Sequence, residues 1–480
     1  MLFKRMVILL GLVLMLTVPL QGQVLAQTIA NANDGTTLKQ IIVFGRHSIR
    51  SSTTGPAQLE QYAVQSYPDF EVGTGCLTPN GSTAENLLGA YYRQYLLQAG
   101  LLTGNDSLDA ARSYFRSNSI ERSWMTATAF GTGLIPSFPP PVHSYPISYP
   151  VSQPDPVFDP ILANVAKVDP NAAAAQVQEI FYSGAALESA YSDEYSLLYS
   201  VLFGTLPPPP TGCPSPCGCT DPTAQAITLN PSTTTPSPAV NPCTPSITTP
   251  LYTGGVINMG GLQSVLSAAD PFVMQLADGL EVGWGQLTPD QVSQLTRLVS
   301  LQFDIEMLSP YLNRVQSSNA ASHVLRTMQQ AILHRRVPGA FGNAKSRMVV
   351  VISSDAYVAG LAGLFNAHWQ LPGYQPDFCA PGGALVFELR QYNRSKQYLV
   401  RVFYTAQTFD QLRSLTPLTL QNPPATMQLL IPGGSRSATN LDVQFGVFQK
   451  LLRNAIGYGY VEKPWKEDPP GVLTGVSCPE

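Results

Sequence analysis

The sequence predicts an α/β fold in which a mostly parallel sheet is flanked by helices and carries an inserted all-helical domain. Two apolar runs, 41–44 and 348–352, have the composition of strands that are buried on both faces. Each run ends in polar residues, as strands of a parallel sheet do where a ligand site begins. Between the two runs, residues 161–345 show helical periodicity and no convincing strand. A sheet interrupted by a helical insertion accounts for all three observations.

The elements of the N-terminal part follow from the spacing of apolar residues. Residues 80–102 carry them at intervals of three and four, which indicates a helix with one face packed on the sheet. Thr78 or Asn80 can cap its start, and Gly100 lies near its end. A short strand at 114–117 and a helix at 122–130 follow.

The later elements are predicted in the same way. Helical patterns in the insertion cover 173–202, 259–280, 289–312 and 320–334. A buried helix at 358–365 follows the second apolar run, and an amphipathic helix at 441–456 lies near the C-terminus. Two alternating segments, 384–391 and 397–405, predict an antiparallel hairpin.

The first apolar run ends in a cluster of groups suited to phosphate chemistry. Arg46, His47 and Arg50 emerge together at the carboxyl end of the predicted strand. The two guanidiniums offer planar forks to a phosphate, and a neutral imidazole between them is a candidate nucleophile towards phosphorus. A solvated surface patch is the alternative interpretation of the same residues.

The second apolar run places an acid at the same edge of the sheet. Asp355 follows 348–352 and precedes the predicted helix. Phosphoryl transfer to a histidine needs an acid that protonates the departing oxygen, and a carboxyl beside a phosphate dianion is more readily protonated. Asp355 can also cap the following helix, and the two roles are compatible.

At this point the chain resembles the histidine acid phosphatases, the branch of the histidine phosphatase superfamily that contains bacterial phytases and glucose-1-phosphatases. The first match is between Arg46-His47-Ser48-Ile49-Arg50-Ser51-Ser52-Thr53 and the family's Arg-His-Gly-x-Arg-x-Pro-Thr. Further matches, in the family's order, lie at 77–81, 121–123, 155–160, 283–285, 371–373 and 381–388.

The resemblance assigns roles to individual residues. It implies that His47 is the nucleophile, that Arg46, Arg50 and Arg122 bind the phosphate, and that Asp355 is the acid. The implied activity is hydrolysis of phosphomonoesters, of the phytate or sugar phosphate type, through a phosphohistidine intermediate. This reaction requires neither a cofactor nor a metal ion.

Two departures from the family pattern concern the site. The family's Gly-His-Asp-Thr-Asn is Ser353-Ser354-Asp355-Ala356-Tyr357 here, so Ser354 replaces a histidine that also binds phosphate. Ser48 replaces a glycine. A hydrogen bond to a charged group is worth roughly 1.5 to 3 kcal/mol, so the loss of the histidine costs about 10- to 100-fold in transition-state binding. The alternative function is a pseudo-phosphatase that binds phosphate esters without hydrolysing them.

Residues 1–26 have the pattern of a cleaved secretory signal. Lys4 and Arg5 precede an apolar core, and Val24-Leu25-Ala26 fits the cleavage site. We therefore expect a secreted or periplasmic protein. Since no later stretch approaches about 18 uninterrupted apolar residues, we expect no stable membrane association.

The predicted organisation after the signal is an α/β domain in two pieces, 27–160 and 346–480, with a helical cap domain at 161–345. The formal net charge of −4 and the charged fraction of 12% give no indication of a nucleic-acid partner. The expected partner is a small phosphomonoester, and the expected state is a monomer. From the cap and the nucleophile motif, Thr53, Asp270 and Arg314 are weaker candidates for contacts with the substrate.

The seven cysteines indicate disulfides in an exported chain. Four of them lie in 206–250, an insertion dense in Pro, Thr and Ser that we expect to project into solvent. A zinc site at Cys213, Cys217 and Cys219 is an alternative. Cys76 and Cys379 precede two of the motifs and are a possible pair. An adhesive or structural role for 206–250 is a third function hypothesis, which rests on composition alone.

Overall fold

The computed structural model describes residues 34–144, 154–204, 219–232 and 256–463. The predicted signal at 1–26 lies outside these residues. Within them, no helix is both long enough and apolar enough to cross a bilayer.

An eight-stranded sheet forms the centre of the described structure, in the order β10-β8-β7-β1-β6-β2-β3, with β9 paired to β8. The strands β1, β6, β2 and β3 are parallel neighbours, whereas β7, β9 and β10 run in the opposite direction. Their bounds are β1 Thr36–Arg46, β2 Ser113–Ser117, β3 Val142–His143, β6 Met348–Ser353, β7 Ala384–Tyr392, β8 Tyr398–Ala406, β9 Ala425–Gln428 and β10 Val443–Gln444. The predicted α/β fold with a mostly parallel sheet is confirmed.

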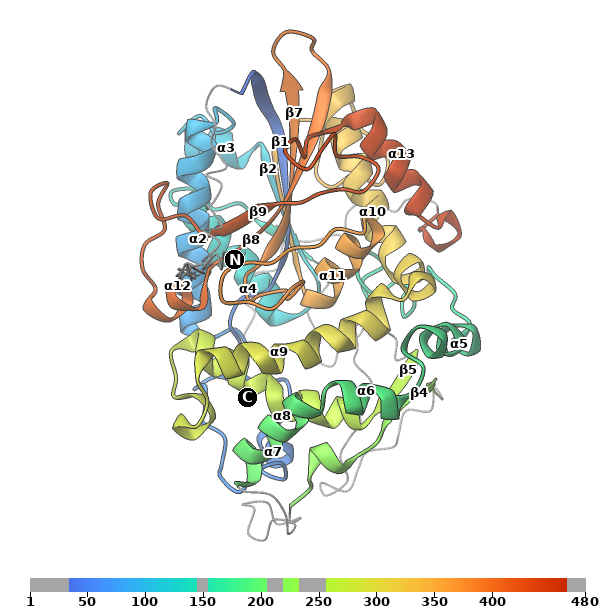
Figure 1. Cartoon of the computed structure of the whole chain (residues 1–480). Helices are drawn as coiled ribbons and strands as arrows, with labels where there is room; N and C mark the ends of the chain where they lie inside the picture. The colour runs from blue at the N-terminus through green and yellow to red at the C-terminus, as the bar shows by residue number, and fades with distance from the viewer. Residues whose placement is uncertain (1–33, 145–153, 205–218, 233–255, 464–480) are drawn as a thin grey trace, which may run out of the picture.

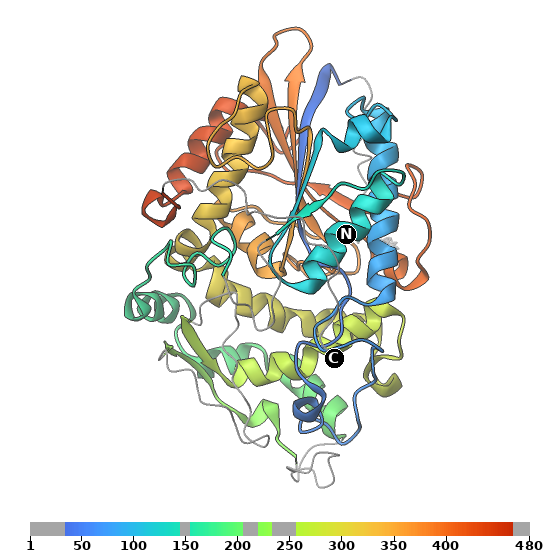
Figure 2. The same ribbon diagram turned by 180° about the vertical axis from the view of Figure 1, so that it is seen from behind.

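Helices cover both faces of this sheet (Figures 1 and 2). One face carries α2 and α4, and the other carries α10, α11 and α13. Strand β1 supplies both cores, because Ile41 and Val43 point into one and Ile42 and Phe44 into the other. The helices with their bounds are α1 Pro56–Leu59, α2 Pro79–Gln98, α3 Asp106–Ala110, α4 Glu121–Leu134, α10 Pro310–Leu333, α11 Asp355–Leu364, α12 Phe409–Ser414 and α13 Phe445–Ala455.

The remaining helices gather beyond the carboxyl ends of β1 and β6, in the lower half of Figure 1. They are α5 Pro170–Phe181, α6 Gly184–Ala190, α7 Ser192–Phe203, α8 Gly261–Asp278 and α9 Pro289–Phe303. The helical pattern expected over 173–202 is therefore divided among α5, α6 and α7. A π-helical turn, Asp304–Leu308, joins α9 to α10.

The expectation of an all-helical insertion is wrong at one place. Strands β4 (Ile227–Pro231) and β5 (Ile257–Gly260) form a two-stranded antiparallel sheet within 161–345. Ile227 and Leu229 alternate with more exposed residues and are buried, as are Ile257 and Met259. This short alternation is a strand signal that the surrounding Pro and Thr residues obscure. The described part of 206–250 thus packs against the helices instead of projecting into solvent.

The segment 51–76 leaves the sheet and packs among these helices. The Tyr67 hydroxyl donates to the Ala268 carbonyl at 3.0 Å, and its ring stacks on Phe272. Trp284 Nε1 donates to the Ser66 carbonyl at 2.8 Å. The sheet part and the helices are therefore joined by a segment that lies outside the predicted cap.

Close backbone contact fixes α2 against α4. A Cβ placed on Gly89 of α2 would lie 2.1 Å from the Phe130 carbonyl oxygen, and one on Gly133 of α4 would lie 1.9 Å from the Asn86 carbonyl oxygen. Neither contact leaves room for a side chain.

We expect Gly89→Ala to lower the free energy of unfolding by about 1 to 3 kcal/mol, because a methyl group there overpacks the contact between α2 and α4. Gly446→Ala in α13 is the matched control, since a Cβ at Gly446 meets nothing within 4 Å. Helix propensity alone favours alanine at both positions. Urea unfolding of both variants checks this, and stabilisation by Gly89→Ala would contradict the contact.

Candidate active site

Pairing of β1 with β6 brings the two predicted motifs together. Arg46 and Ser353 are partners in the parallel register, so the next residues, His47 and Ser354, leave the sheet at the same edge. The His47 amide donates to the Ser353 carbonyl at 2.8 Å and continues the pairing by one residue. The expectation that the two strand ends share one edge is confirmed.

The imidazole of His47 is buried and its tautomer follows from one contact. Its Nδ1 lies 2.8 Å from the Ser48 carbonyl oxygen. Because a carbonyl only accepts hydrogen bonds, Nδ1 carries the hydrogen and Nε2 carries the free electron pair. Burial, and then the charges of Arg122, Arg46 and Arg50, hold the pKa of His47 well below its usual value of 6.5. The ring is therefore neutral with Nε2 available.

Arg46 is held from two sides at the end of β1. Its Nη2 lies 3.0 Å from Asp355 Oδ2, and its Nη1 donates to the Cys379 carbonyl at 2.5 Å. Only 3% of the Arg46 surface is exposed. The guanidinium and the Asp355 carboxyl are thus fixed beside each other at the rim of the sheet.

The turn 379–383 supports residues 46–48 from behind. The Arg46 amide donates to the Gly383 carbonyl at 2.8 Å, and the Gly382 amide donates to the His47 carbonyl at 3.0 Å. From the other side, Thr126 Oγ1 of α4 accepts the Ser48 amide at 3.0 Å. Residues 46–48 therefore have little freedom to move.

The second arginine of the motif forms a two-bond ion pair with a helix of the insertion. Arg50 Nη1 and Nη2 donate to Asp270 Oδ2 and Oδ1 at 2.7 and 2.8 Å. Burial raises the pKa of Asp270, but the charges of Arg50, Arg46 and Arg122 outweigh it and the pKa is lowered. Asp270, predicted as a weak candidate, thus lies close to all three arginines.

Arg122 reaches the same place from the first turn of α4. Its Nη1 donates to the Gly75 carbonyl at 3.1 Å. Its charge lowers the pKa of His47 more than the charges of Arg46 and Arg50 do. The neighbouring Glu121 accepts the Leu77 amide at 3.1 Å, which joins the start of α4 to the start of α2. The three predicted phosphate arginines surround one imidazole.

Ser354 and Asp355 begin α11. Ser354 is the N-cap residue, but its side chain makes no capping hydrogen bond. Its hydroxyl is buried and has no hydrogen-bond partner among the described residues. Asp355 is the first residue of the helix, with Oδ1 accepting the Ala356 amide at 3.1 Å. The Ser354 hydroxyl is thus a buried polar group beside His47 without a hydrogen bond among the described residues.

No protein-family model matches the chain. It is 27% identical to phytase AppA from Escherichia coli strain K12 over 426 residues. This alignment covers 88% of this chain and 91% of the relative. It is 25% identical over 429 residues to a glucose-1-phosphatase from Salmonella typhimurium strain LT2, covering 87% of this chain and 94% of that protein.

Solved structures agree with these relatives. The Hafnia alvei phytase in complex with tartrate matches with a TM-score of 0.74 and 25% identity, over 89% of this chain and 99% of that one. The Citrobacter braakii phytase has the same fold, with a TM-score of 0.74 and 21% identity over 88% of this chain and 99% of that one. These similarities confirm the predicted resemblance to the histidine acid phosphatases.

Three weaker predictions of substrate-contacting residues have different outcomes. Asp270 lies at the site, as described above. Thr53 is exposed, although its Cγ2 is near Gly75 and hence near Arg122. Arg314 is not brought to the site, because it is exposed and its Nε donates to the Ala455 carbonyl at the end of α13.

Two further predictions are corrected or stay open. Cys379 is a free, buried thiol, so it does not pair with Cys76. Cys76 and Cys219 are each disulfide-bonded. The four other cysteines lie outside the described residues, so their pairing stays a prediction. Among the described residues, no group of three or more His, Cys, Asp or Glu side chains is placed to hold a metal ion. The alternative zinc site lies mostly outside that part of the chain.

Sequence reasoning missed several residues that support the site. They are Thr126, whose hydroxyl holds the Ser48 amide, the Cys379 carbonyl, and Glu85 of α2. Only Glu85 gave a usable signal, since it is a carboxyl on the otherwise apolar and aromatic buried face of a helix.

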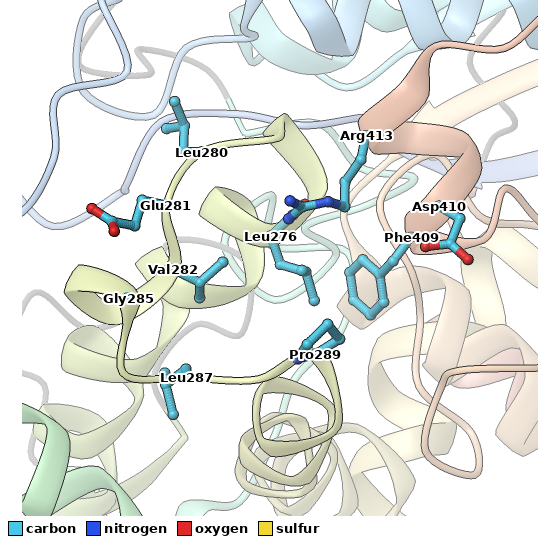
Figure 3. Close-up of a pocket in the computed structure, with 10 residues that line it drawn as sticks. All are labelled: Leu276, Leu280, Glu281, Val282, Gly285, Leu287, Pro289, Phe409, Asp410 and Arg413. Carbon is cyan, nitrogen blue, oxygen red and sulfur yellow. The ribbon is translucent and has the colours of Figure 1, made fainter.

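A separate hollow of about 240 Å³ lies between the end of α8, the turn Val282–Gly285 and α12 (Figure 3). Leu276, Val282, Leu287 and Phe409 form much of its lining. None of the predicted site residues lines it, so it is distinct from the histidine site.

We expect Asp270→Asn to reduce the loss of stability on acidification. A carboxylate with a lowered pKa in the folded state stabilises the protein above its unfolded value of about pH 4, and this contribution is lost as the pH falls through the folded pKa. The free energy of unfolding, measured from about pH 6 to about pH 2.5, should therefore fall less steeply in Asp270→Asn than in the wild type.

Asp278→Asn, on the same helix, is the matched control with the opposite sign. Burial raises the pKa of Asp278, with hydrogen bonds from Thr78 and Asn80 opposing it. Folding favours the neutral form of Asp278, so its contribution to the free energy of unfolding declines as the pH rises. Equal slopes for Asp270→Asn and the wild type would show that the Arg50 pair does not stabilise the fold.

Proposed function

We propose that this chain is a phosphomonoester hydrolase that acts through a phosphohistidine intermediate on His47. The observation that carries the proposal is the buried neutral imidazole whose Nε2 is available among three guanidiniums. The relatives named as phytases and glucose-1-phosphatases support a phosphatase and do not support a protein that only binds phosphate esters.

In the first step, Nε2 of His47 attacks phosphorus and the bond from phosphorus to the ester oxygen breaks. Asp355 is the acid of this step and gives a proton to the departing oxygen. The hydrogen on Nδ1 stays on the ring, where the Ser48 carbonyl stabilises the positive charge that the phosphorylated imidazole acquires. The products are an alcohol and a phosphohistidine.

In the second step, the Asp355 carboxylate takes a proton from water as the water oxygen attacks phosphorus. The bond between phosphorus and Nε2 breaks, phosphate leaves, and the neutral imidazole and the protonated acid are restored. Arg46, Arg50 and Arg122 neutralise the equatorial oxygens in both steps, so catalysis consists largely of positioning and electrostatic stabilisation.

The substrate class we propose is a phosphomonoester of the phytate or sugar phosphate type. Phytate and glucose 1-phosphate carry their charge on phosphate, which three clustered arginines attract locally despite the net charge of −4. We also propose export after removal of 1–26, a monomeric state, and a division into 27–160 with 346–480 against a cap at 161–345. The site then lies between these two parts, since Asp270 of α8 contacts Arg50.

We expect His47→Ala and Asp355→Asn both to abolish release of phosphate from an aryl phosphate between about pH 3 and about pH 8. Only His47→Ala should also abolish labelling of the protein by phosphate, because Asp355→Asn keeps the nucleophile. His368→Ala is the control, since His368 is exposed and bonded to Asp377. A His47→Ala variant with full activity would refute the mechanism.

We expect Ser354→His to raise the rate at low substrate concentration by about 10- to 100-fold, through a charged donor to the phosphate. Ser354→Ala should change the rate little, because the hydroxyl has no partner among the described residues. Phosphate release by the wild type and both variants at one acid pH checks this. A Ser354→Ala variant that is as impaired as His47→Ala would contradict this assignment.

A further inference from the structure

A buried carboxyl that the proposed mechanism does not use lies behind the nucleophile. Glu85 belongs to α2, and 1% of its surface is exposed. Its neighbours on the buried face of that helix are apolar or aromatic, including Leu88 and Tyr92. A carboxyl in such surroundings needs a specific reason to be there.

Two residues touch this carboxyl: Ser48, which follows His47, and Gly382 of the turn 379–383. We call residues 46–48 together with 379–383 the nucleophile turn. A Cβ placed on Gly382 would lie 2.1 Å from Glu85 Oε1 and 3.6 Å from Ser48 Oγ, so both oxygens lie against Gly382. Gly382 in turn donates its amide to the His47 carbonyl. Glu85 Oε1 and Ser48 Oγ are both buried, and a hydrogen bond from the Ser48 side chain acts on the pKa of Glu85. The carboxyl therefore packs directly on the residues that hold His47.

Glu85 is neutral where an acid phosphatase works. Burial raises its pKa to about 8, and the adjacent Ser48 hydroxyl opposes that rise. A protonated carboxyl can donate a hydrogen bond, whereas a carboxylate can only accept. Ionisation would therefore change both the charge and the hydrogen-bonding capacity of the group.

Charged and titratable residues lie on several elements around Glu85, but none of them contributes to the shift of its pKa. Its own pKa responds to burial and to Ser48. The titratable or charged residues on the elements packed around it are Arg46 and His47 at the end of β1, Cys379 on the turn, Tyr92 on α2, Glu121 and Arg122 on α4, Tyr404 on β8, Asp278 on α8, and Asp410 and Arg413 on α12.

We propose that Glu85 is a positioning residue of the nucleophile turn, which supports Ser48 and Gly382 as a neutral acid and weakens binding of dianions when it ionises. This inference rests on the proposed phosphate site. A desolvated charge acts over longer distances than a solvated one, so a carboxylate behind His47 opposes the field of the three arginines. The family pattern that this chain resembles has glycine at the position of Ser48, so a hydroxyl beside Glu85 departs from that pattern.

The test is the pH dependence of sulfate binding, since sulfate remains a dianion throughout and needs no chemistry from Asp355. Titration calorimetry should show that wild-type affinity falls about three- to tenfold between about pH 7 and about pH 9. In Glu85→Gln, which is neutral at every pH, the affinity should change less than about twofold. A wild-type slope that persists in Glu85→Gln would overturn the inference.

Asp159→Asn is the matched control. Burial also raises the pKa of Asp159 to about 8, but this carboxyl accepts a hydrogen bond from the Tyr357 hydroxyl at 2.5 Å instead of packing on the nucleophile turn. Asp159→Asn should keep the wild-type slope. If the pH dependence of sulfate affinity disappeared only in Asp159→Asn, the titrating group would be Asp159 and the proposal would be refuted.

Ser48→Ala provides a second test of the proposal if thermal unfolding shows that Glu85→Gln does not fold. Without the hydroxyl the pKa of Glu85 rises, so the fall in sulfate affinity should move to higher pH. An unmoved fall would contradict the proposal. Absence of sulfate binding to the wild type at about pH 5 would instead refute the proposed phosphate site, which distinguishes the two failures.

Discussion

The site depends on the parallel pairing of β1 with β6, two strands that are about three hundred residues apart in the chain. The register that places Arg46 beside Ser353 determines that His47 and Ser354 leave the sheet together. A shift of that register by one residue would turn every side chain of the strand to the other face and separate the imidazole from the acid. The apolar residues on both faces of β1 hold the register, because each contributes to a different core.

Charge around the imidazole is balanced by carboxylates that come from different parts of the chain. Arg46 pairs with Asp355 of α11, and Arg50 pairs with Asp270 of α8. Burial of this many charges is tolerable only when each has a partner. Burial, and then the charges of the three guanidiniums, lower the pKa of His47 and keep the imidazole neutral. On the proposed mechanism, His47 therefore acts as the nucleophile without a separate base.

The sequence predicted the parts of this structure that depend on local periodicity. The strands around 41–44 and 348–352, the hairpin of β7 with β8, and the helix after Thr78 were recoverable because burial on one or two faces leaves a regular pattern. The sheet of β4 and β5 was not, since each strand is short and lies beside Pro and Thr residues. Arg314 was misplaced because a charge on a helix does not say which partner its face will meet.

The support behind the site was largely hidden from sequence reasoning for a related reason. The Cys379 carbonyl and the Thr126 hydroxyl act through positions that only the folded chain brings near Arg46 and Ser48. A backbone carbonyl carries no side-chain signature at all. The free state of Cys379 likewise follows from where the turn lies, and two cysteines that each precede a motif gave a misleading suggestion of a pair.

The path of 51–76 has a consequence for how the protein folds. This segment follows the nucleophile in sequence, yet Tyr67 and Ser66 are bonded to the helices of the insertion through Ala268 and Trp284. Excision of 161–345 would expose the aromatic surface of Tyr67 to water. We therefore expect the two parts that the chain order separates to unfold as one cooperative unit, with neither stable when expressed alone.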